Sequence, residues 1–155
     1  MKLPNQNSQN QIPCEYSKIT ENIFIGTNKC CQAKFAEELV KQGITADLSL
    51  EAERVDTPFG ADFFVWIPVE DRTPPTQEEF KLGVWVLDGL IKMNRKVYVH
   101  CQYGLGRSPA MVAAHFISQG ITTEKAIEKI RQKRPAINLE ENQIKALKKF
   151  ENTIK

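Results

Sequence analysis

Hydrophobic residues fall along the chain in two alternating patterns, one typical of strands and one typical of helices. Short apolar runs bounded by Gly, Pro or polar residues predict strands at 19–26, 44–50, 62–69 and 96–100. Apolar residues spaced three and four apart predict helices at 33–42, 76–94, 108–119, 122–133 and 139–154. Because strands alternate with helices, we expect a single α/β domain with a mostly parallel central sheet flanked by helices, in which 96–100 is a central strand.

Residues that start and stop helices support these limits. Thr76 is suited to an N-cap, and Glu79 lies in the first turn that follows it. Gly120 and Pro135 are suited to end the two helices that precede them. The segment 70–76 (EDRTPPT) has two prolines and an aspartate, so it predicts a loop.

The remaining bulk properties indicate one ordinary globular domain. Residues 1–17 are rich in Asn, Gln and Ser and predict a flexible or surface-draped arm, so the domain covers 18–155. The net charge of +2 gives no reason to expect nucleic acid or an anionic membrane as a partner. No apolar stretch is long enough for membrane insertion, and the N-terminus lacks the apolar core of a signal peptide. We therefore expect a cytoplasmic monomer.

The four cysteines form no short metal-binding pattern. Cys14, Cys30, Cys31 and Cys101 show no C-x-x-C spacing, and only two histidines could join them, so no zinc site is expected. A disulfide framework is also not expected in a chain of this length with so few cysteines. We expect no metal and no cofactor, and each cysteine has to be judged separately.

The most informative stretch is VHCQYGLGRSP at 99–109. A predicted strand delivers Cys101 to its carboxyl end, five residues with Gly104 and Gly106 follow, and a helix begins near Arg107. Ligands of open α/β sheets bind at the carboxyl ends of strands, and a helix N-terminus attracts anions. The glycines allow successive N–H groups to turn toward one oxyanion. The pattern predicts a phosphate-binding loop between strand and helix.

The same stretch provides a nucleophile. A thiol at a helix N-terminus beside Arg has a lowered pKa, so Cys101 is expected to be a thiolate at neutral pH. Arg107 can hold two phosphoryl oxygens with its planar guanidinium. Ser108 can hydrogen-bond the sulfur and help it to leave. The residues expected to contact the phosphate are Gln102, Tyr103, Gly104, Leu105, Gly106 and Arg107.

The segment HCQYGLGRS resembles the H-C-x5-R-S/T signature of the protein tyrosine phosphatase superfamily. Its surroundings resemble the small dual-specificity branch over roughly residues 19–150. The resemblance implies a general acid on a loop about thirty residues before the nucleophile, where Asp71 lies in PVEDRTPP. Asp71 would protonate the leaving oxygen and later accept a proton from water. Two alternatives are that Asp71 is only a turn residue and that Glu70 is the acid.

The resemblance also suggests supporting residues. It implies that His100 orients the phosphate loop and tunes the thiol, although a buried structural histidine is equally consistent with the sequence. Asn138 and Gln143 lie where such enzymes carry polar residues that brace the loop, or they are exposed polar residues near a helix end. His115 is expected to be structural. Arg131, Lys133 and Arg134 are expected to form a solvated helix end.

The implied reaction is hydrolysis of phosphate monoesters through a phosphocysteine intermediate, with phosphotyrosine and phosphoserine or phosphothreonine in proteins as substrates. The uncharged Gln102, Tyr103 and Leu105 argue against highly phosphorylated inositol lipids. Three other classes share parts of the pattern: a phosphate-binding pseudoenzyme, a rhodanese-like sulfurtransferase, and the low-molecular-weight phosphatase or arsenate reductase fold. The last has its nucleophile near the N-terminus and its acid downstream, which is the opposite order.

Overall fold

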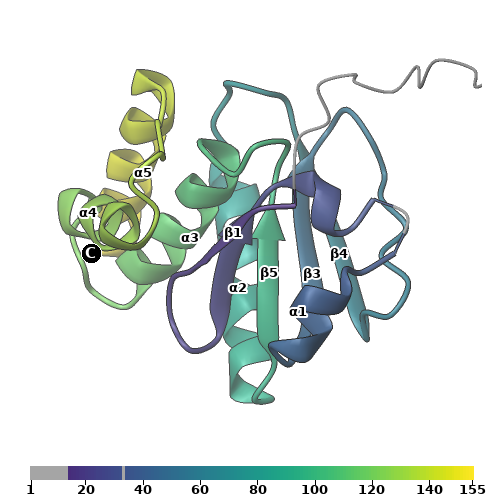
Figure 1. Ribbon diagram of the computed structural model, residues 1–155. Helices are drawn as coiled ribbons and strands as arrows, with labels where there is room; N and C mark the ends of the chain where they lie inside the picture. Colours follow the sequence, from purple (N-terminus) through teal and green to yellow (C-terminus); the bar gives the residue numbers. More distant parts are fainter. Residues whose placement is uncertain (1–13, 33) are drawn as a thin grey trace, which may run out of the picture.

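The computed structural model describes residues 14–32 and 34–155, and a five-stranded sheet forms its centre. The strand order is β1-β2-β5-β3-β4, with β1 antiparallel to β2 and every other neighbouring pair parallel. This confirms the mostly parallel sheet, and the strand predicted at 96–100 lies in its middle (Figure 1). The strands are β1 (Tyr16–Lys18), β2 (Ile23–Gly26), β3 (Ile44–Glu51), β4 (Phe63–Val69) and β5 (Lys96–His100).

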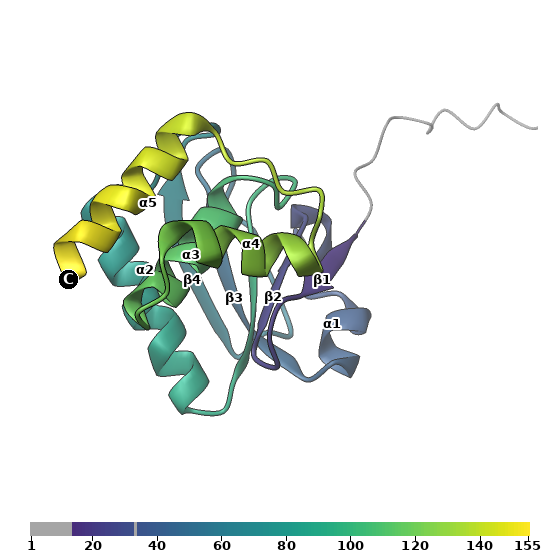
Figure 2. The ribbon, with the colours of Figure 1, turned by 90° about the vertical axis from the view of Figure 1, so that its left-hand side faces the viewer.

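Helices cover both faces of this sheet. Figures 1 and 2 show the short α1 on one face and α2 to α5 gathered on the other. Each face has its own buried apolar cluster, a large one beneath α2 to α5 and a small one that contains Phe35, Leu39 and Tyr98. The helices are the 3-10 turn η1 (Asn28–Cys30), α1 (Glu37–Lys41), α2 (Gln77–Lys92), α3 (Arg107–Ser118), α4 (Thr123–Lys133) and α5 (Glu141–Ile154).

The N-cap expected for α2 is confirmed, because Thr76 forms a reciprocal capping box with Glu79. Thr122 caps α4 by accepting a hydrogen bond from the N–H of Lys125. The first eleven residues of α3 are all buried, as its almost continuous apolar sequence predicts. This helix therefore runs through the core from the end of the central strand, which fixes its N-terminus in place.

Two predicted elements are shorter than their sequence patterns. The first strand begins at Ile23, because residues 19–22 form a turn in which Thr20 accepts hydrogen bonds from following N–H groups. The helix predicted at 33–42 is reduced to α1. The N–H of Phe35 bonds to the carbonyl of Phe59 at 2.8 Å, so the chain before α1 is held by tertiary contacts. Val40, an apolar residue of that helical pattern, is 51% exposed.

The chain is folded further toward the N-terminus than the expected boundary at residue 17. Residues 1–13 of the expected arm lie outside the described residues. Tyr16 and Ser17 pair with Gly26 and Ile25 as the antiparallel edge of the sheet. Cys14 forms a disulfide with Cys30, so one pair is linked although no disulfide framework was expected. The pairing arises because β1 runs back along β2 and brings Cys14 beside η1.

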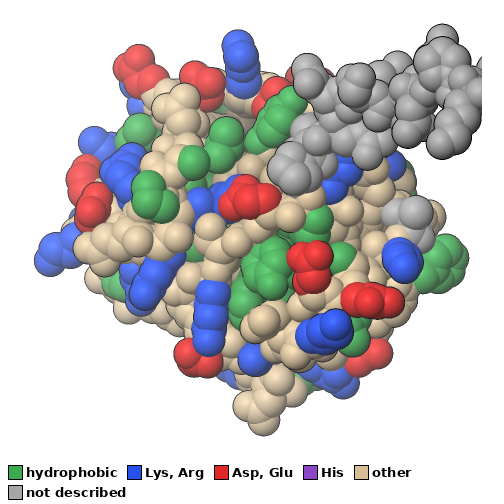
Figure 3. Space-filling view, in the orientation of Figure 1, with side chains coloured by type: hydrophobic (Ala, Val, Ile, Leu, Met, Phe, Trp, Pro, Cys, Tyr) green, Lys and Arg blue, Asp and Glu red, His purple; other side chains and the backbone are tan. Residues whose placement is uncertain are grey.

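The surface and helices give two further observations. Within 14–32 and 34–155, no helix is both long enough and apolar enough to span a bilayer. On the face shown in Figure 3, acidic and basic side chains are interspersed.

Candidate active site

The loop between β5 and α3 curls around the sulfur of Cys101. Cys101 follows the last residue of β5 and is 3% exposed, and α3 begins at Arg107. Gly104 has φ +70°, and a Cβ at this position would lie 2.6 Å from the carbonyl oxygen of Gly26. Only glycine fits here without strain or a clash, which allows the loop to close tightly above the sheet.

Arg134 anchors this loop from behind. Its Nε donates to the carbonyl of Gly104 at 2.8 Å, and its Nη2 donates to the carbonyl of Tyr103 at 3.0 Å. The guanidinium is also paired with Glu15, at 2.6 Å from Nη1, and the side chain is 3% exposed. The expectation of a solvated helix end is therefore wrong for Arg134, whereas Arg131 is exposed.

Two backbone hydrogen bonds hold the other loop carbonyls. The N–H of Asn28 donates to the carbonyl of Gln102 at 3.2 Å, and the N–H of Asn138 donates to the carbonyl of Leu105 at 2.8 Å. Because the carbonyls are bound on the outside of the loop, its N–H groups are available to an anion. Gln102 acts in this framework and does not line the pocket described below.

The sulfur of Cys101 lies 3.3 Å from the hydroxyl oxygen of Ser108. Burial alone would raise the pKa of the Cys101 thiol. The hydroxyl and backbone N–H of Ser108, together with the charge of Arg107, outweigh burial, so the pKa is lowered. This arrangement favours a thiolate at the N-terminus of α3.

Arg107 is held in one orientation although it is almost fully buried. Its Nη1 donates to Oε2 of Glu53 at 2.8 Å and to the carbonyl of Val69 at 2.7 Å. Its Nη2 lies 3.5 Å from Oδ1 of Asp71. Glu53 also accepts a hydrogen bond from the N–H of Asp71 at 3.0 Å, so one carboxylate positions both the arginine and the aspartate.

Asp71 lies on the loop between β4 and α2. Its side chain is 59% exposed, and Oδ1 accepts a hydrogen bond from the N–H of Arg72 at 2.9 Å. Arg72 has φ +60°, a left-handed conformation that is unfavourable for a side chain of this size. The surrounding contacts therefore hold the loop in a specific shape beside the phosphate loop.

The beginning of α5 provides these contacts. Asn142 donates to the carbonyl of Arg72 at 3.0 Å, and Gln143 donates to the carbonyl of Thr73 at 3.3 Å. Gln143 is buried, and a Cβ on Gly106 would lie 3.1 Å from its Oε1. Gln143 thus contacts the Asp71 loop and packs against the phosphate loop.

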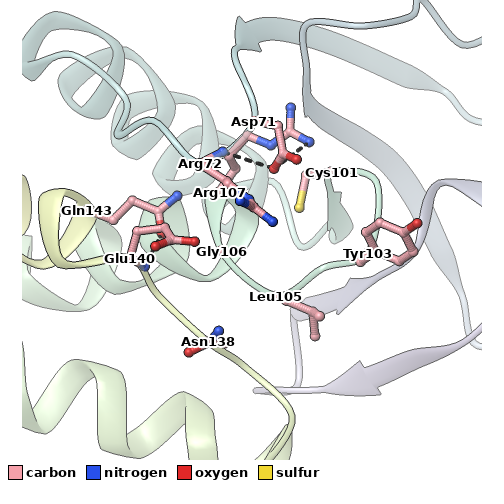
Figure 4. Close-up of a pocket in the computed structure, with 10 residues that line it drawn as sticks. All are labelled: Asp71, Arg72, Cys101, Tyr103, Leu105, Gly106, Arg107, Asn138, Glu140 and Gln143. Carbon is pink, nitrogen blue, oxygen red and sulfur yellow. Dashed lines mark hydrogen bonds and ion pairs between the residues drawn. The ribbon is translucent and has the colours of Figure 1, made fainter.

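These loops surround a cavity of about 200 Å³. Figure 4 shows Asp71 and Arg72 on one side, Tyr103 and Leu105 on another, and residues from the start of α5 on a third. Glu70 is not among the lining residues. Glu140 does line the cavity and is the N-cap residue of α5, where its N–H donates to Oε1 of Gln143 at 2.8 Å. The lining residues are Asp71, Arg72, Cys101, Tyr103, Leu105, Gly106, Arg107, Asn138, Glu140 and Gln143.

His100 lies directly behind the loop and is fully buried. Its Nδ1 is 3.3 Å from the carbonyl oxygen of Cys101, and its Nε2 is 3.0 Å from Oδ1 of Asp47. Burial alone would lower the pKa of His100, but the carboxylates of Asp47 and Asp56 raise it to about 9. The ring therefore connects the nucleophile's backbone to a group of buried carboxylates.

Sequence reasoning missed Glu53, Asn142 and the role of Arg134. Glu53 follows β3, the neighbour of β5, and the carboxyl ends of parallel strands meet at one edge. That rule was the available signal for Glu53, whereas nothing local marks Arg134. His115 is buried beside Asp88, with Nδ1 3.0 Å from Oδ1, and does not line the cavity.

Comparison with known sequences gives one family. The model of the dual specificity phosphatase catalytic domain matches residues 23–153. The chain is 36% identical over 111 residues to protein tyrosine phosphatase type IVA 3 of Mus musculus, an alignment that covers 64% of this chain and 61% of the relative. It is 27% identical over 117 residues to dual specificity protein phosphatase 5 of Rattus norvegicus, covering 74% of this chain and 30% of the relative. The alignments thus span about three fifths of the first relative and about a third of the second.

Solved structures share the fold at low sequence identity. Human DUSP28 superposes with a TM-score of 0.81 at 17% identity, covering 92% of this chain and 97% of that one. The human tyrosine phosphatase-like serine/threonine/tyrosine-interacting protein superposes with a TM-score of 0.77 at 22% identity, covering 91% and 98%.

Proposed function

Because the chain belongs to the family of dual-specificity phosphatase catalytic domains, we propose that it hydrolyses phosphate monoesters through a phosphocysteine intermediate. One observation carries the proposal: the buried sulfur of Cys101 lies 3.3 Å from the hydroxyl of Ser108, with a lowered pKa, at the N-terminus of α3. A thiolate in an anion-binding loop is the nucleophile that this reaction needs.

In the first step, the thiolate of Cys101 attacks phosphorus and the bond to the leaving oxygen breaks. The N–H groups of the loop and the free donors of Arg107 bind the three phosphoryl oxygens as charge shifts among them. Asp71 gives its proton to the leaving oxygen, because an unprotonated alkoxide or phenoxide leaves poorly. The alcohol departs and phosphate remains on the sulfur.

In the second step, water attacks the phosphocysteine. The carboxylate of Asp71, left ionised by the first step, accepts a proton from that water. The hydroxyl of Ser108 donates a hydrogen bond to the departing sulfur and stabilises the thiolate that forms again. The products are inorganic phosphate and the enzyme in its starting state.

We propose phosphotyrosine and phosphoserine or phosphothreonine in proteins as substrates, as the names of the relatives suggest for those proteins. Tyr103, at the mouth of the cavity, is 48% exposed and can pack beside a substrate side chain. Among the residues that the structure describes, Arg72 is the only cationic residue besides Arg107 that lines the cavity, which supports a substrate with one phosphate group.

We also propose that the enzyme acts in the cytoplasm as a monomer without nucleic acid. The interspersed charges of the face in Figure 3 support the last part, since a nucleic-acid surface collects basic residues. In a reducing compartment the disulfide between Cys14 and Cys30 would open, so activity should not depend on it.

The test is turnover of an aryl phosphate by the wild-type protein and by Cys101→Ser. We expect phosphate release and a trapped phosphocysteine for the wild type, and binding of tungstate without turnover for the variant. Binding without turnover by both proteins would support a phosphate-binding pseudoenzyme instead. Thiosulfate and arsenate test the sulfurtransferase and arsenate reductase alternatives, and a panel of phosphopeptides, inositol phosphates and nucleotides identifies the substrate class.

A further inference from the structure

A buried group of ionisable side chains behind the phosphate loop has no role in the proposed reaction. Cys31 follows η1, Asp47 lies in β3, Asp56 lies in the loop after β3, and His100 ends β5. Cys31, Asp47 and His100 are 0% exposed and Asp56 is 2% exposed. A thiol, two carboxylates and an imidazole from four separate segments therefore meet inside the protein.

The ring of His100 contacts the other three side chains. Nε2 of His100 lies 3.0 Å from Oδ1 of Asp47, 3.1 Å from Sγ of Cys31 and 3.5 Å from Oδ2 of Asp56. Sγ of Cys31 lies 3.8 Å from Oδ2 of Asp56. Nε2 carries at most one proton, so it can donate to only one of these three groups. The thiol of Cys31 can donate to Oδ2 of Asp56, whereas Asp47, in the part of the chain that the structure describes, has only Nε2 within reach.

Asp47 is the least satisfied member of the group. Among residues 14–32 and 34–155, its Oδ2 has no hydrogen-bond donor, although the side chain is fully buried. Asp56 is balanced in part by Arg54, whose Nε lies 2.9 Å from Oδ1. A buried carboxylate oxygen without a donor is costly, and it is the atom that a bound cation would satisfy.

We propose that Cys31, Asp47 and His100, whose ligand atoms all lie within 4.8 Å of one another, bind a divalent transition-metal ion of the Zn²⁺ type. Sulfur, imidazole nitrogen and carboxylate oxygen are the donors that zinc takes in proteins. With metal–ligand bonds of about 2.0–2.3 Å, a tetrahedral site separates its donors by roughly 3.3–3.7 Å. Nε2 of His100 lies 3.0 Å from Oδ1 of Asp47 and 3.1 Å from Sγ of Cys31, within a few tenths of an ångström of this range.

The other nitrogen of His100 supports the same assignment. A histidine that binds a metal through one nitrogen commonly donates the other N–H to a backbone carbonyl. Nδ1 of His100 faces the carbonyl of Cys101 at 3.3 Å. An ion on Nε2 would thus fix the ring that contacts the nucleophile's own backbone. The ion is a structural or regulatory ligand behind the active site and takes no part in phosphate chemistry.

The sequence did not predict this site because its ligands are not close in the chain. They lie at positions 31, 47 and 100, whereas zinc sites are recognised in a sequence by pairs of ligands a few residues apart. The parallel pairing of β3 with β5 brings Asp47 beside the end of β5, and η1 adds Cys31 from the other side.

The test is a cobalt titration of the Cys101→Ser protein handled without reductant. The disulfide occupies Cys14 and Cys30, so Cys31 is the only free thiol of this variant. We expect one equivalent of Co²⁺ to bind with a thiolate-to-cobalt charge-transfer absorption, and Zn²⁺ to displace it. Because the catalytic thiol is absent, the result does not depend on the proposed function.

Matched variants in the same background locate the ion. We expect Asp47→Asn and Cys31→Ser to weaken cobalt binding at least tenfold, and His115→Asn, which removes the other histidine, to leave it unchanged. Thermal unfolding without metal checks that each variant is folded. If Asp47→Asn does not fold, Cys31→Ser provides the test, because it only replaces the sulfur atom by oxygen. Absence of the absorption, or equal binding by a folded Cys31→Ser, would overturn the proposal.

Discussion

Nη1 of Arg107 donates hydrogen bonds to both carboxylate oxygens of Glu53, at 2.8 Å to Oε2 and 3.1 Å to Oε1. Burial alone would lower the pKa of Arg107, but Glu53, Cys101 and Asp71 raise it. Nη1 is fully used by Glu53 and the carbonyl of Val69, so Nε and Nη2 remain for phosphate. Glu53 is therefore a positioning residue for the phosphate-binding arginine.

Glu53→Gln should weaken phosphate binding. The amide keeps the shape of the side chain but loses the charge-assisted bond to Nη1, so Arg107 is held less firmly. Loss of such a bond is worth about 1.5 kcal/mol for a half-exposed partner, which corresponds to a roughly tenfold lower kcat/KM. The inhibition constant of inorganic phosphate should rise by a similar factor.

Glu70→Gln is the matched control for that experiment, because Glu70 is exposed, carries the same charge and does not line the cavity. It should leave kcat/KM and phosphate inhibition unchanged. If Glu53→Gln also left both quantities unchanged, Arg107 would be oriented by Val69 and the loop alone.

Ser108→Ala should raise the pKa of Cys101. The hydroxyl is the strongest of the contacts that lower this pKa. Without it, the opposing effect of burial raises the pKa. The thiolate is the species that reacts with iodoacetamide, and a lowered pKa keeps it present at low pH. The alkylation profile of Cys101 should lie below that of a free cysteine, whose pKa is about 8.5, and shift to higher pH in the variant. Identical profiles would show that the hydroxyl does not stabilise the thiolate.

Arg134→Gln should both destabilise the fold and weaken phosphate binding. It leaves the carbonyls of Tyr103 and Gly104 without their donor and Glu15 without its partner. Buried groups left unpaired in this way cost about 2–3 kcal/mol, measurable by urea unfolding. Arg131→Gln, three residues earlier in α4 and exposed, should cost less than about 0.5 kcal/mol. Equal effects of the two variants would show that Arg134 does not anchor the phosphate loop.

The parts of the site that could be placed from sequence are those close together in the chain. Cys101, Arg107 and Ser108 lie within eight consecutive residues, and a strand, a tight loop and a helix leave them little freedom of arrangement. The glycine at 104 follows from the same geometry, since the loop must turn where a side chain would meet the backbone of Gly26. Strand and helix order likewise predicted the parallel sheet.

The parts that sequence did not reveal depend on contacts between distant segments. The sequence suggests that Arg134 is the basic end of an amphipathic helix, and its inward position depends on its hydrogen bond to the distant Gly104. The shortened α1 has the same cause, because Phe35 bonds to the distant Phe59 instead of continuing a helix. The disulfide of Cys14 depends on the antiparallel return of β1, for which a strand of three residues gives almost no periodic signal.

The assignment of Asp71 as the general acid offers the most direct test of the proposed mechanism. If Asp71 protonates the leaving oxygen, its importance depends on how much help that oxygen needs. Asp71→Asn should reduce the rate modestly for p-nitrophenyl phosphate, whose leaving group is stable without a proton. For an alkyl phosphate such as phosphoserine the loss should be roughly 10²–10⁴-fold.

The pH–rate profile separates this acid from a residue that only shapes the loop. Turnover of the wild type should fall on the alkaline side as the acid loses its proton, and Asp71→Asn should flatten that limb. Glu70→Gln should retain the limb, and so should Glu140→Gln, because Glu140 lines the cavity but serves as a helix cap. Equal losses for all leaving groups with an unchanged alkaline limb would mean that Asp71 acts through its contacts with Arg72 and Arg107, and that another group supplies the proton.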